Sequence, residues 1–132
     1  MSSHDLNSVM LYIHPPLAIA GEILVFLFAA LLSVSRYTEK RATRYVGWSA
    51  WLLTLAGLVS GAVWAQIAWG SYWSWAPTET STLLLFLSVT VNVAAYHEGK
   101  MKLAKWVALA SCFLAIVTIS LLFTIPGLHS YA

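Results

Sequence analysis

The sequence predicts an all-α fold: a polytopic membrane protein built as a four-transmembrane-helix bundle with an external Trp-rich loop. Of its 132 residues, 60% are apolar and only 9% are Asp, Glu, Lys or Arg, whereas a soluble domain carries about a quarter charged residues. The mean hydropathy is +0.77. A net charge of +2 is not a basic surface. These values exclude a soluble domain, a disordered tail and a nucleic-acid-binding protein.

Four apolar stretches are each long enough to cross a bilayer, which takes about 20 helical residues. We expect these spans at residues 11–35, 45–68, 80–97 and 104–126. They are too long and too uniformly apolar for buried strands. The four prolines lie near the span ends, where proline is tolerated: Pro15, Pro16, Pro77 and Pro126. Without an internal repeat or a composition shift, residues 1–132 are predicted to form a single domain.

All seven basic residues lie in two of the connections. Four fall between spans one and two, and three between spans three and four: Arg36, Lys40, Arg41, Arg44, Lys100, Lys102 and Lys105. Because cytoplasmic loops carry an excess of Lys and Arg, both basic loops are predicted to be cytoplasmic. Both termini and the Trp-rich loop are then on the outer side of a cell (inner or plasma) membrane.

The Trp-rich loop, residues 64–80, reads WAQIAWGSYWSWAPTET. Five aromatic residues fall within twelve positions: Trp64, Trp69, Tyr72, Trp73 and Trp75. Tryptophan is common at membrane interfaces, where its amphipathic ring suits the headgroups. Anchoring alone does not need so many rings, and a flat aromatic shelf suits a large planar apolar ligand.

Two histidines flank this loop in the predicted topology. His14 begins span one and His129 follows span four, so both return to the outer surface. Either one alone reads as an interfacial polar residue, and His4 as a solvent-exposed one. Together with the shelf, two neutral imidazoles at His14 and His129 predict the axial ligands of a haem iron. Cys112 is the single cysteine and no CxxCH motif is present, so the haem is predicted to be non-covalent haem b, not covalent c-type haem.

Two further residues are polar at membrane depth or at its edge. His97 ends span three and reads either as a helix-end histidine or as a ligand to a second, inner haem iron that needs a partner's ligand. Glu22 interrupts span one, where an acidic residue costs about 2.5–3.5 kcal/mol and is usually functional or paired. Proton uptake, quinol binding and an interhelical hydrogen bond are the alternatives for Glu22.

Residues 69–79, WGSYWSWAPTE, resemble the external motif W-G-x-Y-W-x-W-D-P-x-E of the haem-handling, or WWD-domain, family of cytochrome c biogenesis proteins. That family includes CcsA (ResC), CcmC and CcmF. His14-Pro15-Pro16 is similar to its first external histidine. Tyr96-His97 is similar to the membrane histidine of CcsA, and residues 127–131, GLHSY, to the second external histidine in its CcsA-like context. The resemblance spans nearly the whole chain in the same order.

This resemblance implies that the loop and the external histidines present haem for attachment to apocytochrome c. The inner haem would be shared with a histidine of a CcsB-like membrane subunit, and a haem chaperone replaces the apocytochrome in the CcmC branch. Glu79 keeps the motif's glutamate, whereas Ala76 replaces its aspartate. The site residues implied are His14, His129 and His97 with Trp69, Tyr72, Trp73 and Trp75.

The resulting hypothesis is a minimal four-helix CcsA-like protein that presents haem at the outer face for cytochrome c maturation. It would be a component of a haem lyase rather than a complete enzyme. The alternative is a b-type haem electron-transfer or anchor subunit of a respiratory or quinol-linked membrane complex, in which Glu22 is proton-linked. A third reading is a structural membrane subunit whose aromatic loop packs against a partner. Position 76, taken as an exposed loop residue, is expected to accept Asp without disturbing the fold.

Overall fold

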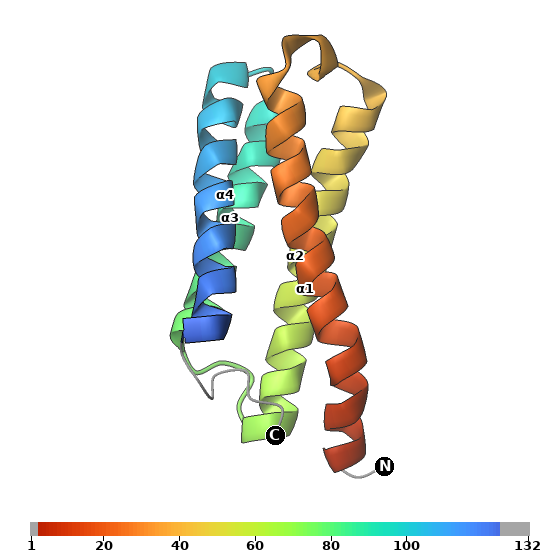
Figure 1. Ribbon diagram of the computed structural model, residues 1–132, viewed down its shortest axis with the longest axis vertical. Coiled ribbons are helices and arrows are strands. Elements are labelled where there is room, and N and C mark those ends of the chain that lie inside the picture. Colours follow the sequence, from red (N-terminus) through yellow and green to blue (C-terminus); the bar gives the residue numbers. More distant parts are fainter. Residues whose placement is uncertain (1–2, 125–132) are drawn as a thin grey trace.

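The computed structural model describes the backbone of residues 3–124 and the side chains of residues 12–121. Four long helices account for most of it (Figure 1), and the described part contains no strand. They are α1 (Ser3–Ser33), α2 (Arg41–Trp69), α3 (Pro77–His97) and α4 (Met101–Thr124), with a short 3-10 helix η1 (Ser35–Tyr37) after α1. All four are long and apolar enough to cross a membrane. The predicted fold class, an all-α four-helix membrane bundle, is confirmed.

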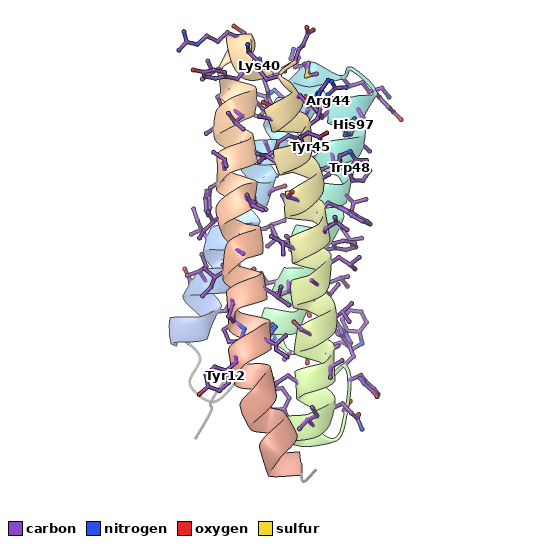
Figure 2. The ribbon with its side chains drawn as sticks, turned by 90° about the vertical axis from the view of Figure 1, so that its right-hand side faces the viewer. Tyr12, Lys40, Arg44, Tyr45, Trp48 and His97 are labelled. Carbon is purple, nitrogen blue, oxygen red and sulfur yellow. The ribbon has the colours of Figure 1, made fainter. Side chains whose placement is uncertain are left out.

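The helices run alternately up and down, so the connections sort to two ends (Figure 1). The α1–α2 and α3–α4 connections lie together at one end, which we call the basic end because it carries the Lys and Arg residues. The loop between α2 and α3 lies at the opposite end with the start of α1, and we call this the loop end. Figure 2 places Lys40 and Arg44 at the basic end, far from Tyr12.

All four helices start earlier than their predicted spans, and in α1 and α3 the earlier start changes where the prolines lie. α1 already begins at Ser3, so Pro15 and Pro16 lie inside the helix rather than at its start. Each proline removes one hydrogen bond to the residue four positions before it. α3 begins at Pro77, because proline fits the first helical position, where its missing N–H needs no partner. The irregular part of the Trp-rich loop is therefore only residues 70–76, hereafter the α2–α3 loop.

Small residues let α1 and α2 approach each other closely. A Cβ on Gly57 would lie 3.3 Å from the Cα of Ala18, and one on Gly21 would lie 3.1 Å from the backbone of Leu53. Close approach at small residues is how helices associate where no water drives apolar burial. The contact between Ala18 and Gly57 thereby fixes the register of α1 along α2.

Hydroxyl pairs join α3 to α4. Ser81 and Thr118 are 2.6 Å apart at their hydroxyl oxygens, and Ser88 and Ser111 are 2.7 Å apart. Each hydroxyl thus has a partner inside the bundle, which an apolar surrounding requires. At the basic end, the Tyr96 hydroxyl donates a buried hydrogen bond of 2.6 Å to the main-chain oxygen of Thr38. This bond ties the end of α3 to the α1–α2 connection.

Candidate functional site

His14 lies on α1, half-buried against α2 at the loop end. Its Nδ1 is 3.0 Å from the Ser60 hydroxyl, although the two residues are 46 positions apart. The Ser60 hydroxyl donates to the main-chain oxygen of Gly57 at 3.1 Å. Because a hydroxyl has a single proton, its oxygen accepts from Nδ1–H of a neutral His14, and the ring's lone pair is then on Nε2. A ring nitrogen held in this way is typical of metal-ligating histidines.

Gly61 makes room for the His14 ring. A Cβ at this position would lie 3.0 Å from His14 Cε1 and 3.5 Å from both ring nitrogens. The ring therefore rests on bare backbone one turn beyond Gly57. Gly57 and Gly61 form a G-x-x-x-G pattern on α2, which is a sequence signal of close helix packing. This pattern could have predicted that α1 packs closely against α2 beside His14.

A cavity of about 40 Å³ lies beneath the α2–α3 loop. His14 lines it from α1, Gly61 and Trp64 from α2, Trp73 and Ala76 from the loop, and Glu79 from α3. The structure thus brings His14 together with the loop that the sequence analysis predicted to form a ligand site. His129, the second predicted ligand, lies outside the described residues.

The aromatic residues form two edge-to-face pairs instead of one flat shelf. Trp64 and Trp69 have ring centroids 4.7 Å apart at 77°, and Trp73 and Trp75 have centroids 5.5 Å apart at 88°. Perpendicular contacts place the positive edge of one ring against the negative face of the other. In the first pair Trp64 is 2% exposed and supports Trp69, which is 50% exposed. The rings presented to the surroundings are those of Trp69, Trp75 and Tyr72.

Glu79 organises the α2–α3 loop. Its Oε2 accepts a hydrogen bond of 2.8 Å from the main-chain N–H of Ser74 and one of 3.3 Å from that of Ala76. The Ser74 hydroxyl adds a bond of 3.2 Å to the same oxygen. Trp75, between these two amides, has a φ of 59°, a left-handed conformation that is uncommon for a bulky residue. The Glu79 carboxylate therefore holds the backbone on both sides of a strained tryptophan.

Ala76 is the last residue of the α2–α3 loop and the N-cap of α3. It is half-buried and lines the cavity, so the expectation that this loop position is exposed was wrong. The reason is that Pro77 starts the helix at the next residue. Ala76 has no side chain that can accept from the first-turn amides, and Glu79 supplies the reciprocal half of a capping box from the third helical position. The pattern of Pro77 followed by Glu79 is a helix-start signal that could have been read from the sequence.

His97 lies at the basic end with Lys40 and Arg44, far from Tyr12 of α1 (Figure 2). Its ring is 5.1 Å from that of Trp48 on α2, tilted by 35°. His97 is exposed, and the Trp48 side chain that it contacts is 47% exposed. The structure therefore places His97 at the opposite end of the bundle from His14.

Glu22 faces the interior of the bundle and is 8% exposed. It lines a second cavity, of about 50 Å³, which also has His14 in its wall. Four threonines from α2, α3 and α4 also line it: Thr54, Thr78, Thr82 and Thr118. These threonines carry no distinctive sequence signal, because threonine is common in membrane helices and only the packing brings them together.

The residues at the loop end fit a haem by three observations. His14 supplies an oriented imidazole, Gly61 leaves the space that its ring occupies, and Trp69 and Trp75 expose apolar rings. Trp73 Nε1 is buried with no hydrogen-bond partner among the described residues, so it is a donor suited to a carboxylate such as a haem propionate. A cavity of about 40 Å³ is far smaller than a haem, which would lie against the exposed rings.

Comparison with known proteins identifies the family. A family model described as "Cytochrome C assembly protein" matches residues 1–129. The chain is 36% identical over 103 residues to the cytochrome c biogenesis protein CcsA of Synechococcus sp. (strain JA-3-3Ab), covering 76% of this chain and 30% of the relative. It is 31% identical over 134 residues to CcsA of Porphyra purpurea, covering 99% of this chain and 42% of the relative.

A third relative, CcsA of Pyropia yezoensis, is 41% identical over 91 residues, which cover 67% of this chain and 28% of the relative. The chain thus spans less than half the length of these curated relatives. No solved structure matches it. The family model covers nearly the whole chain, and the chain therefore belongs to the cytochrome c assembly protein family.

Proposed function

We propose that this protein binds haem b non-covalently at the loop end and presents it for cytochrome c maturation. The observation that carries the proposal is the position of His14. The packing of α1 on α2 brings its oriented imidazole into the cavity beneath the tryptophan loop. The family membership supports the same role, since the relatives are cytochrome c biogenesis proteins.

The proposed roles combine the geometry of the described side chains with the family resemblance. His14 would ligate the haem iron together with His129, which lies outside the described residues. Trp69, Tyr72 and Trp75 contact the haem with their exposed rings, and Trp73 donates its indole N–H to a propionate. Glu79 keeps the loop in the conformation that presents Trp75. Bound haem supplies the iron and the vinyl groups with which the cysteine thiols of an apocytochrome react.

The proposed topology places the loop end on the outer side of a cell membrane and the basic end in the cytoplasm. The grouping of all basic residues at one end supports it. An apocytochrome c or a haem chaperone would meet the loop there, and a CcsB-like membrane subunit would complete the assembly. His97 is proposed as the ligand of an inner haem shared with that subunit, because its exposed ring is accessible to a neighbouring helix.

The comparisons do not favour the electron-transfer or anchor subunit, since the relatives are biogenesis proteins. The two roles differ in haem turnover. A presenting protein transfers haem to an added apocytochrome with reduced CxxCH thiols, whereas an electron-transfer subunit retains its haem and is reduced by quinol.

The test is the absorption spectrum of the purified protein, loaded with haem, beside three variants. His14→Ala and His129→Ala are each expected to shift or abolish the spectrum of the bis-histidine haem, whereas His4→Ala is the matched control and retains it. Mixing the loaded wild type with reduced apocytochrome then follows haem transfer. Retention of the wild-type bis-histidine spectrum by both ligand variants would overturn the ligand assignment, and retention of all haem would overturn presentation.

A further inference from the structure

The cavity beside Glu22 lies among all four helices. Its walls come from α1 (Glu22), α2 (Thr54), α3 (Thr82) and α4 (Thr118), so it is at the centre of the bundle. The hydroxyls of Thr54, Thr82 and Thr118 already donate to main-chain oxygens of their own helices. The group that is costly in this apolar surrounding without a polar partner is therefore the Glu22 carboxyl. The arrangement therefore points to a polar occupant.

This inner cavity adjoins the cavity beneath the α2–α3 loop. Four residues line both of them: His14, Gly57, Thr78 and Thr82. Glu22 lies eight positions after His14 on α1, which is a rise of about 12 Å along the helix. The two cavities together therefore lead from the loop end to Glu22.

Thr78 stands where the cavities meet and provides an independent observation. It is 4% exposed, and its Oγ1 is buried without a hydrogen-bond partner among the described residues. Thr82 does have a partner, because its hydroxyl donates a hydrogen bond of 2.8 Å to the main-chain oxygen of Thr78. A buried hydroxyl that lacks a partner among the described residues marks a position where an ordered polar molecule can bind.

The volume of the inner cavity limits which polar molecule can occupy it. A water needs about 10–15 Å³ of such space and two to four polar partners, so about 50 Å³ holds roughly three to five waters. A cavity that takes up an aromatic ring is about 150 Å³. The ring of a quinol is therefore too large, and water fits both the volume and the hydroxyl-bearing walls.

We propose that these joined cavities hold a chain of waters that carries protons between the loop end and Glu22. A proton enters from bulk water at the loop end, moves by exchange along the waters past Thr78, and binds a Glu22 carboxylate oxygen; release is the reverse. The titratable groups in the walls are His14, Glu22 and Glu79. The path requires no haem and is independent of the proposed function.

Hydrogen–deuterium exchange of the Glu22 carboxyl group tests this path in the haem-free protein in lipid nanodiscs. At acidic pH, the infrared carbonyl band of protonated Glu22 is identified by its absence in Glu22→Gln. After a switch to D₂O, the wild-type band is expected to shift within the mixing time. Thr78→Val, which removes the hydroxyl at the junction, is expected to slow the shift by at least about tenfold.

A second variant and a matched control complete the design. Thr82→Leu extends an apolar side chain into the cavities and is expected to slow the exchange as well, so the test stands if one variant fails to fold. Thr90→Val makes the same substitution on α3 at a position that lines neither cavity. It removes the hydrogen bond of 2.9 Å from Trp51 Nε1, which lies outside the proposed path, and is expected to exchange like the wild type. A wild-type band that exchanges as slowly as buried helical amides would overturn the proposal. Equal rates in the wild type and every folded cavity variant would overturn it too.

Discussion

Ser74 donates two hydrogen bonds to the Glu79 carboxylate, one from its main-chain N–H at 2.8 Å and one from its hydroxyl at 3.2 Å. The first turn of α3 thereby controls the backbone of the loop that precedes it. Since Ala76 also donates to Glu79, the main-chain N–H groups of both neighbours of Trp75 are held by one side chain. This relationship makes the loop conformation testable without any ligand.

Glu79→Ala is expected to loosen the α2–α3 loop. Loss of charge-assisted bonds worth about 1.5–3 kcal/mol each would let Trp75 leave its left-handed conformation. Amide hydrogen exchange at Ser74 and Ala76 should then accelerate by at least about tenfold, while exchange in α2 stays unchanged. The control is Glu98→Ala, which removes only an exposed ion pair with Lys100. Unchanged exchange at both loop amides would contradict the role given to Glu79.

Ala76→Asp is expected to stabilise the start of α3. An N-cap carboxylate accepts from the amides of the first turn, which is worth about 0.5–2 kcal/mol relative to alanine. Repulsion from the nearby Glu79 carboxylate opposes part of this gain, so Ala76→Ser serves as the uncharged comparison. The unfolding free energy in mixed micelles should rise for both variants. A lower unfolding free energy for Ala76→Ser would show that the missing N-cap side chain does not limit the stability of α3.

Gly61→Ala is expected to weaken haem binding about tenfold, as an added methyl 3.0 Å from His14 Cε1 displaces the ring. The measurement is a haem titration followed by absorbance. Ser60→Ala removes the hydrogen bond to His14 without adding atoms and should lower the affinity through ring orientation alone. If neither variant changes the affinity for haem, the contacts of His14 with α2 do not contribute to haem binding.

Trp75→Asn separates the loop backbone from the aromatic surface. Asparagine tolerates a left-handed backbone better than other side chains with a Cβ, so the loop is expected to keep its conformation while the exposed ring is lost. Haem affinity should fall, but amide exchange at Ser74 should match the wild type. Trp75→Phe retains a ring and is expected to lose less affinity. Equal affinity in all three proteins would exclude Trp75 from the haem contact.

Tyr96→Phe is expected to destabilise the fold by about 1–3 kcal/mol, because it leaves the buried main-chain oxygen of Thr38 without its donor. Unfolding in mixed micelles measures the loss. Tyr45→Phe is the matched control, since Tyr45 is 63% exposed and should tolerate the change. Equal effects from the two variants would mean that the Tyr96 hydroxyl contributes nothing specific.

The four spans were predictable because a bilayer requires long apolar helices, and hydropathy records that requirement directly. The grouping of the basic residues at one end followed from the number and lengths of the spans. The closeness of His14 to Ser60 did not, because it depends on the register of α1 along α2. That register is set by contacts such as Ala18 against Gly57, which hydropathy cannot report.

The aromatic loop was located from the sequence, but its geometry was not. Composition showed an excess of rings, and a flat shelf was the expected arrangement. The perpendicular contact between Trp73 and Trp75 reflects ring quadrupoles and the backbone conformation of one residue. The role of Glu79 was readable in part from its position two residues after Pro77, whereas its bond to the Ser74 amide required the folded loop.

The contact between Ala18 and Gly57 fixes the position of His14 along α2 and the direction in which its side chain points. One residue inserted between His14 and Ala18 would rotate His14 by about 100° around α1 and turn it away from Gly61. Seven inserted residues would restore the face but move the ring about 10 Å along the helix, beyond Gly61. Sequences that build this site are therefore constrained in the spacing of His14 and Ala18 as strictly as in the identity of the histidine.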